Sequence, residues 1–144
     1  MEIYFKRNDQ CFNLRVVAII KRDDKVLFKK DLDHFYTFPG GRVRFGETTE
    51  RAIKRILYEN FNLRVTINRL VSINENFFSY SDDDYHEVLF VYHCDLREDS
   101  IDEPLHSNLH SVSVHDLFQI NIQPRFLIEE LKRLPLNISH TVNK

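Results

Sequence analysis

Apolar and β-branched residues gather in two neighbouring segments near the start of the chain. The first segment spans residues 11–20 (CFNLRVVAII), and the second spans residues 21–30 (KRDDKVLFKK). β-branched and aliphatic side chains favour extended backbone, and the polar residues Arg22, Asp23 and Asp24 favour a tight turn. The pattern therefore predicts a hairpin that starts a β-sheet.

A helical period replaces this pattern after residue 47. Apolar residues recur there at spacings of three and four, which is typical of a helix with one buried face. Thr48 or Thr49 can cap its start, and Asn62 can end it because asparagine tolerates the left-handed conformation. The expected buried face consists of Ala52, Ile53, Ile56, Leu57 and Phe61.

Strand-like segments return after this helix. Residues 63–67 (LRVTI), 69–78 (RLVSINENFF) and 85–94 (YHEVLFVYHC) are rich in β-branched and aromatic residues. The acidic loop at residues 79–84 (SYSDDD) separates the last two segments. We expect two paired strands joined by this loop.

The last organised segment is a second helix at residues 123–134 (QPRFLIEELKRL). It follows a polar and irregular stretch at residues 98–113. Pro124 suits the first helical position, and Pro135 ends the helix. Its expected buried face consists of Phe126, Leu127, Ile128, Leu131 and Leu134.

Length and composition fit one globular domain. The chain has 144 residues, of which 42% are apolar and 29% are charged. A domain of this size buries roughly 70% of the surface of its unfolded chain, so it can form a core without disulfides. We expect a single α/β domain over residues 1–144, with a mixed or antiparallel sheet, two helices and a loose tail at residues 135–144.

Charge and apolar runs restrict the possible partners and the compartment. The net charge of -2 and the pI near 6.4 argue against nucleic acid or an acidic membrane as a partner. Residues 16–20 form the longest apolar run, which is far too short to span a membrane, and the first ten residues lack the order of a signal peptide. Cys11 and Cys94 have no metal-ligand spacing and are expected to be buried. We therefore expect a cytoplasmic protein.

All the glycines of the chain lie in one loop, at Gly40, Gly41 and Gly46. Pro39 precedes them and favours an extended residue before it, while the glycines allow the chain to turn tightly. Such a loop also lets backbone groups approach a metal ion or a phosphate. The alternative interpretation is an ordinary turn.

The spacing that starts at Gly41 resembles the Nudix box. Glu47 follows after five residues and Arg55 after seven more, as in the pattern Gly-x5-Glu-x7-Arg-Glu-U-x-Glu-Glu-x-Gly-U, where U is aliphatic. With the flanking strands and the C-terminal helix, the resemblance extends over roughly residues 12 to 134. Further matching positions are Leu57, Glu59 and Leu63.

Three positions depart from the family pattern. Ile56 and Asn60 stand where the pattern has glutamates, and Asn62 stands in place of the last glycine. Isoleucine neither binds metal nor accepts a proton, and asparagine offers an oxygen ligand without charge. Glu47 and Glu59 are the remaining box carboxylates, so efficient catalysis is in question.

The resemblance implies an α/β/α sandwich with a mixed sheet and a Mg²⁺- or Mn²⁺-dependent pyrophosphohydrolase. The substrate would be a nucleoside diphosphate derivative, such as a nucleotide, a nucleotide sugar or ADP-ribose, and a homodimer is possible. Divalent metal would neutralise the diphosphate and activate water. The implied metal ligands are Gly41, Glu47, Glu59 and Asn60. The implied substrate-binding residues are Gly40, Gly41, Arg42 and Arg44. The implied catalytic residues are Glu59, Arg55 and, outside the box, Glu87.

The charge of the box supports an alternative function. Residues 40–62 contain five basic and three acidic residues, for a net charge of +2. This balance favours holding an anion directly over concentrating Mg²⁺. The alternative is a non-catalytic Nudix domain that binds a nucleotide or an ADP-ribose-like ligand as a sensor. A purely structural interaction module is the third hypothesis.

Other candidates have a structural interpretation of equal or greater weight. Glu87 and the loop acids could replace the missing glutamates, or they could face solvent on a strand and a hairpin loop. Two histidines lie near the expected site, and aromatic residues could stack on a nucleobase or fill the core. These further candidates are Asp82, Asp83, Asp84, His34, His86, Phe35, Tyr36, Phe77 and Phe78.

Overall fold

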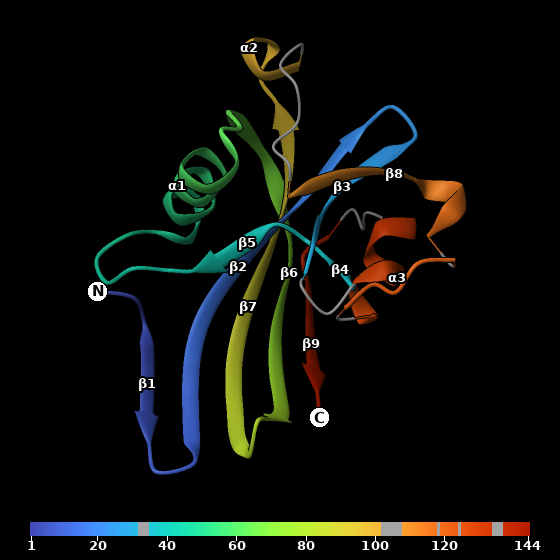
Figure 1. Cartoon of the computed structure of the whole chain (residues 1–144). Coiled ribbons are helices and arrows are strands. Elements are labelled where there is room, and N and C mark those ends of the chain that lie inside the picture. Colours follow the sequence, from blue (N-terminus) through green and yellow to red (C-terminus); the bar gives the residue numbers. More distant parts are fainter. Residues whose placement is uncertain (32–34, 102–107, 118, 124, 134–136) are drawn as a thin grey trace.

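A mixed β-sheet forms the centre of the molecule (Figure 1). Strand β2 (Gln10–Arg22) pairs in parallel with β7 (Asp83–Leu96), which pairs antiparallel with β6 (Val65–Tyr80). The strand order is β4-β3-β2-β7-β6-β9. This computed structural model describes residues 1–31, 35–101, 108–117, 119–123, 125–133 and 137–144.

The predicted hairpin at the start of the sheet is confirmed. β3 (Lys25–Lys30) pairs antiparallel with β2, and Asp23 in the turn has a positive φ of 57°. β3 then pairs with β4 (Tyr36–Thr37) and with β8 (Leu109–Ser113). The stretch predicted to be irregular at residues 98–113 therefore contributes a strand, and it also contains α2 (Glu98–Ile101).

The expectation of a loose tail is wrong for β9 (Ser139–Asn143). This strand pairs in parallel with β6, from Ser72 opposite Ser139 to Asn76 opposite Asn143. The segment is polar and short, so its own pattern gives no strand signal. Its order comes from backbone hydrogen bonds to β6 and from side-chain hydrogen bonds to the asparagines of that strand.

Helices cover the two faces of the sheet (Figure 1). α1 (Thr49–Phe61) packs on the face formed by Val16, Ala18 and Ile20, and its five predicted buried residues are all buried. α3 (Phe126–Arg133) packs on the opposite face, with Val17 and Ile19. Successive residues of a strand point to opposite faces, so β2 serves both cores.

The predicted ends of α1 are confirmed, whereas α3 begins later than predicted. The Thr48 side chain accepts a hydrogen bond from the Arg51 backbone, and Asn62 has the left-handed conformation with φ of 54°. α3 begins at Phe126, and Ile128 and Leu131 are buried as predicted. Pro124, Leu134, Pro135 and His34, together with the Leu127 side chain, lie outside the described residues.

One half of the sheet extends beyond both helices (Figure 1). It contains β1 (Tyr4–Arg7), β9 and the adjoining ends of β2, β7 and β6. Among the described residues no helix is long and apolar enough to cross a membrane. Cys11 and Cys94 are both buried and free, as predicted. The glycine-rich loop lies where the uncovered half of the sheet meets α1.

Candidate functional site

The glycine-rich loop begins as a short strand, β5 (Gly40–Arg42), which pairs with β2. A side chain at Gly40 would place its Cβ 2.1 Å from the carbonyl oxygen of Val16, so only glycine fits. A Cβ at Gly41 would lie 3.3 Å from Cδ1 of Ile56. Gly46 has a φ of 86° and allows the turn into α1. Packing and turn geometry therefore account for these glycines.

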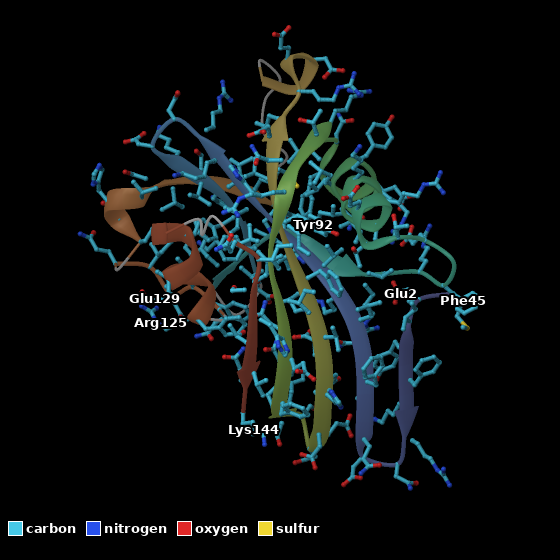
Figure 2. The ribbon with its side chains drawn as sticks, turned by 180° about the vertical axis from the view of Figure 1, so that it is seen from behind. Glu2, Phe45, Tyr92, Arg125, Glu129 and Lys144 are labelled. Atoms are coloured by element: carbon cyan, nitrogen blue, oxygen red, sulfur yellow. The ribbon has the colours of Figure 1, made fainter. Side chains whose placement is uncertain are left out.

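The first residues of the chain hold the loop from its outer side. The Ile3 amide donates to the Val43 carbonyl at 2.8 Å, and the Phe45 amide donates to the Met1 carbonyl at 2.7 Å. Figure 2 shows Glu2 and Phe45 close to each other at this edge of the molecule. Phe45 is 76% exposed, so the loop presents its backbone and its arginines beside an exposed ring.

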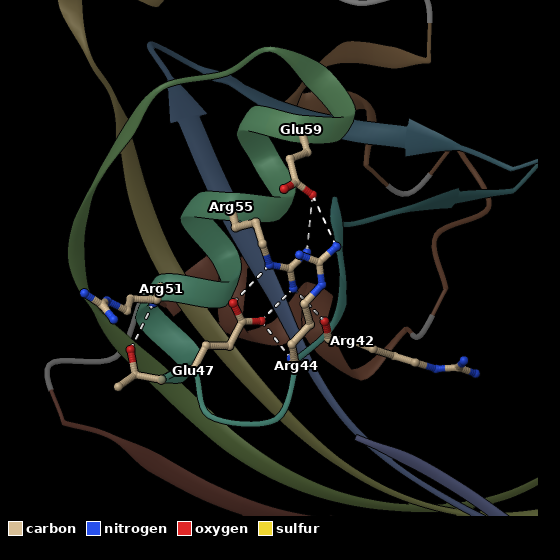
Figure 3. A network of polar contacts seen from close by, with 7 residues as sticks. Arg42, Arg44, Glu47, Arg51, Arg55 and Glu59 are labelled. Atoms are coloured by element: carbon tan, nitrogen blue, oxygen red, sulfur yellow. Dashed lines mark hydrogen bonds and ion pairs between the residues drawn. The ribbon is translucent and has the colours of Figure 1, made fainter. Parts of the chain in front are cut away.

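Glu47 and Arg55 join the loop to α1 (Figure 3). Arg55 donates from Nη2 to Glu47 Oε1 at 2.6 Å and from Nε to Oε2 at 3.0 Å. The Arg44 amide donates to Oε1 at 2.7 Å, and Arg55 Nη2 also donates to the Arg42 carbonyl at 3.1 Å. The hydrogen bonds from Arg55 lower the pKa of Glu47, and those to Glu47 raise the pKa of Arg55. This pair fixes the shape of the loop.

Glu59 lies between two guanidinium groups at the other end of the same network (Figure 3). Its Oε2 is 3.6 Å from Arg55 Nη1 and 3.7 Å from Arg44 Nη2. The side chain is 48% exposed, so ligands from solvent can reach it. The two arginines neutralise a carboxylate that the resemblance to the Nudix box predicts as a metal ligand.

The two substituted box positions differ in their surroundings. Ile56 is 2% exposed and belongs to the core beneath α1, against Gly41. Isoleucine fills this space with carbon atoms, so position 56 offers no oxygen to the loop. Asn60 is exposed. Of these two substituted positions, only Asn60 therefore offers an oxygen ligand, and that oxygen belongs to a neutral amide.

The donor set does not fit a divalent metal centre. Within the described part of the chain, no group of three or more His, Cys, Asp or Glu side chains is placed to hold a metal ion. Glu47 already accepts from Arg55 and Arg44, and Glu59 is paired with both of these arginines. Mg²⁺ prefers several oxygen ligands with a surplus of negative charge, whereas this network has as many arginines as glutamates.

A pocket of about 420 Å³ opens next to the loop on the uncovered half of the sheet. It brings Gly41 and Arg42 of the loop together with Glu87 of β7, and all three residues were predicted for the site. The Arg42 carbonyl links this pocket to the Arg55 network. The other lining residues are Glu2, Asn13, Arg15, Phe78, Tyr80 and Tyr85.

Glu87 is a buried carboxylate in this pocket, with 6% of its surface exposed. It lies on β7, opposite Asn13 of β2 and Asn76 of β6. Asn76 Nδ2 donates to its Oε2 at 2.9 Å, and Arg15 Nη1 lies 3.7 Å from its Oε1. The sequence leaves open whether Glu87 faces solvent or a site. In the structure this residue lines a pocket.

The loop acids do not reach the pocket or the box. The turn consists of Ser81 and Asp82, both with positive φ, so Asp83 and Asp84 belong to β7 and not to a loop. Asp83 pairs with Lys6 at 2.8 Å. Asp84 accepts a hydrogen bond from the Ser79 hydroxyl at 2.7 Å.

The aromatic candidates separate into different environments. Phe78 lines the pocket and stacks on Tyr85, with ring centroids 5.1 Å apart. Phe77 contacts His86, which is exposed, and neither ring lines this pocket. Tyr36 packs edge-on against Phe28 in the core, and the half-buried Phe35 precedes it. Only one of the four predicted aromatic residues thus lines the pocket.

Sequence reasoning missed Asn13, Arg15 and Tyr85. Asn13 and Arg15 alternate with apolar residues in a predicted strand, which marks them as neighbours on one face. Their partner on that face, Glu87, follows from the parallel pairing of β2 with β7. No local pattern reveals a pairing between strands so far apart in the sequence.

Comparison with known proteins identifies the family. The family model of the NUDIX domain matches residues 12–132. The chain belongs to the Nudix family. This confirms the resemblance seen in the box and its flanking elements. No curated protein matches the chain in sequence.

Solved Nudix structures share the fold at low sequence identity. A Nudix hydrolase from Nitrosomonas europaea is 19% identical, with a TM-score of 0.68 over 97% of this chain and 82% of its own. An ADP-ribose pyrophosphatase from Streptococcus suis is 18% identical, with a TM-score of 0.60 over 90% and 98%. A Nudix family hydrolase from Clostridium perfringens is 20% identical, with a TM-score of 0.60 over 85% and 98%. The predicted Nudix α/β fold is confirmed.

Proposed function

We propose that this Nudix domain binds a nucleoside diphosphate derivative in the pocket beside Gly41 and hydrolyses it inefficiently. The observation that carries the proposal is the position of Glu59 between Arg44 and Arg55. Because Glu59 is held by these two arginines, it is not free to recruit a metal ion. Arg42 and Arg15, which line the pocket, would then supply the positive charge that holds the anion.

Arginines at the mouth of the pocket support the binding of a diphosphate. Arg42 points away from the Arg44–Glu59 network (Figure 3) and is held by Glu2 at 3.4 Å. That ion pair is largely exposed, so it contributes only ~0–1 kcal/mol and a phosphate can replace Glu2. Arg15 lies on the same face of the sheet, opposite Arg42 in the pairing of β2 with β5. A planar guanidinium group binds two phosphate oxygens at once, so Arg42 suits this ligand, while Arg15 lies next to Glu87.

The buried Ile56 supports inefficient hydrolysis. The position is 2% exposed and filled by a side chain that accepts no proton. If a general base acts from this position in active members, its loss reduces the rate by roughly 10²- to 10⁴-fold. Binding does not require that base, so it is retained.

A metal-dependent hydrolase is the second candidate function, and one observation favours it. Glu87 is a buried carboxylate that lines the same pocket as Gly41, so it could act as an acid or base outside the box. Mg²⁺ or Mn²⁺ would then have to be recruited with the substrate phosphates. One protein of similar structure is an ADP-ribose pyrophosphatase, which makes ADP-ribose a substrate to test.

Binding and hydrolysis measured on the same ligands separate the two candidates. Calorimetry with ADP, GDP, UDP, ADP-ribose and nucleotide sugars in EDTA should detect binding that Mg²⁺ does not strengthen. Arg42→Gln should weaken that binding, whereas Arg51→Gln should not, because Arg51 is exposed and does not line the pocket. Formation of the nucleoside monophosphate with Mg²⁺ or Mn²⁺, followed by chromatography, should be slow and should equal that of Glu59→Gln. Turnover that is lost in Glu59→Gln, or binding that requires the metal, would support the hydrolase instead.

A further inference from the structure

Buried polar residues lie on the central strands of the sheet, and two of them line the pocket. The described part of the chain has five buried polar or charged residues, and all belong to β2, β6 or β7. Strand pairing places Asn13, Glu87 and Asn76 side by side on one face. A buried polar cluster requires hydrogen-bond partners for each of its atoms. The five residues are Asn13, Ser72, Asn74, Asn76 and Glu87.

The hydrogen bonds of Asn76 define what Glu87 can still accept. Asn143 Nδ2 donates to Asn76 Oδ1 at 2.9 Å, so the Asn76 amide turns its nitrogen to Glu87. Among the residues that the structure describes, Glu87 Oε2 therefore has one hydrogen-bond donor. Within the same residues, its Oε1 has only Arg15 at 3.7 Å, which is an ion pair longer than a hydrogen bond. A carboxylate has about four acceptor positions, so Glu87 can accept further donors from a ligand.

Asn13 offers a second acceptor beside Glu87. The residue is 4% exposed and lines the pocket, and its Oδ1 has no hydrogen-bond partner among the described residues. A buried acceptor without a partner destabilises the empty protein, and a ligand that donates to it removes this cost. The pocket thus presents two neighbouring acceptors, with the donor Arg15 next to Glu87 and aromatic rings along its wall.

Guanine matches this arrangement among the common bases. Its Watson–Crick edge carries the O6 acceptor, then the N1–H donor, then the 2-amino donor. On the same edge, adenine and cytosine each carry one amino donor next to a ring nitrogen that accepts a hydrogen bond. Uracil carries one N–H donor between two carbonyl acceptors. A base stacked on the exposed face of Phe78 or Tyr80 would turn its edge toward the buried acceptors.

We propose that the pocket recognises the guanine of a guanosine diphosphate derivative. Glu87 and Asn13 Oδ1 accept hydrogen bonds from N1–H and the 2-amino group, and Arg15 donates to O6. The proposal rests on the proposed function, since Arg42 of the same pocket holds the diphosphate while Arg15 contacts the base. It adds the identity of the base, which the box does not determine.

Calorimetry with GDP, IDP, ADP, UDP and pyrophosphate tests the proposal on the unmodified protein. IDP lacks only the 2-amino group of GDP, so it should bind at least about tenfold more weakly, the cost of one lost hydrogen bond to a charged or buried acceptor. ADP and UDP should bind more weakly still, because each places an acceptor opposite Glu87 or Asn13. Pyrophosphate reports on the phosphate contacts alone.

Three variants test which residues cause the difference in affinity between GDP and the other ligands. Glu87→Gln should weaken the binding of GDP about tenfold or more and leave the binding of pyrophosphate unchanged. Asn13→Leu should remove the preference for GDP over IDP, and it should fold well because it buries no polar atom. Glu75→Gln is the matched control, because Glu75 pairs with His140 at 2.7 Å outside the pocket.

The outcomes separate recognition of the base from binding of the phosphates. Equal affinity for GDP, IDP and ADP would overturn guanine recognition and leave diphosphate binding intact, because these ligands share the ribose and the phosphates. Absence of binding by all five compounds would overturn both proposals. A Glu87→Gln effect that is matched by Glu75→Gln would also overturn the role of Glu87.

Discussion

Glu47→Gln tests whether the Glu47–Arg55 pair holds the glycine-rich loop on α1. The carboxylate accepts three hydrogen bonds from Arg55 and the Arg44 backbone, and the two side chains are only 16% and 19% exposed. A hydrogen bond to a charged group contributes ~1.5–3 kcal/mol, and glutamine keeps one acceptor, so we expect a loss of ~1–2 kcal/mol. For a chain of this size that corresponds to a fall in Tm of about 3–6 °C.

The pH dependence gives this prediction a second measurement. Hydrogen bonds from Arg55 place the folded-state pKa of Glu47 below its ordinary value of 4.5. Because the folded-state pKa is the lower one, the stabilisation is complete above 4.5 and is lost as the pH falls through the folded-state value. The difference between wild type and Glu47→Gln should therefore be constant from pH 7 to about pH 5 and decrease below that.

Urea unfolding from pH 7 downward measures both quantities, with Glu50→Gln as the control. Glu50 is exposed in the first turn of the same helix, so its loss should cost less than ~1 kcal/mol. Equal stability of Glu47→Gln and Glu50→Gln at pH 7 would refute the reasoning. A stability difference that persists unchanged in acid would refute the assignment to the carboxylate charge.

Three further predictions concern the core and the sheet edge. Gly40→Ala should cost ~3 kcal/mol or more in urea unfolding, because its Cβ would lie 2.1 Å from Val16 O, and a cost below ~1 kcal/mol would contradict the packing. Burial raises the pKa of Cys94 to about 12, so in Cys11→Ser this thiol should react with a disulfide reagent at pH 8 only after unfolding. Deleting residues 138–144 removes β9 and should lower the Tm, whereas an unchanged Tm would mean that β9 contributes little.

The parts of the fold that depend on local signals were predictable. α1 has a helical period, a capping threonine and an asparagine at its end, and the structure reproduces all three. β9 and β1 are short, and pairing with β6 and β2 makes them strands. The loop predicted at residues 79–84 is shorter in the structure, because Ser81 and Asp82 complete the turn by themselves.

The same distinction applies to the candidate site: a contact within one loop and helix could be predicted, and contacts that depend on the tertiary fold could not. The spacing of Glu47 and Arg55 specifies their contact, since both lie on one loop and helix. The pairing of Glu59 with Arg44 depends on how that loop folds back, and the meeting of Asn13 with Glu87 depends on the pairing of β2 with β7. These contacts arise from tertiary structure, which no local period encodes.

The parallel pairing of β2 with β7 also has a consequence for how quickly the protein folds. The register joins Gln10 to Asp84 and Ile20 to Cys94, so the centre of the sheet closes a loop that contains α1 and the whole of β6. The entropy of closing such a loop is lost before the contacts compensate for it, which slows folding in proteins dominated by distant pairings. Refolding on the millisecond-to-second scale is therefore expected, with the β6–β7 hairpin forming before β2 docks against it.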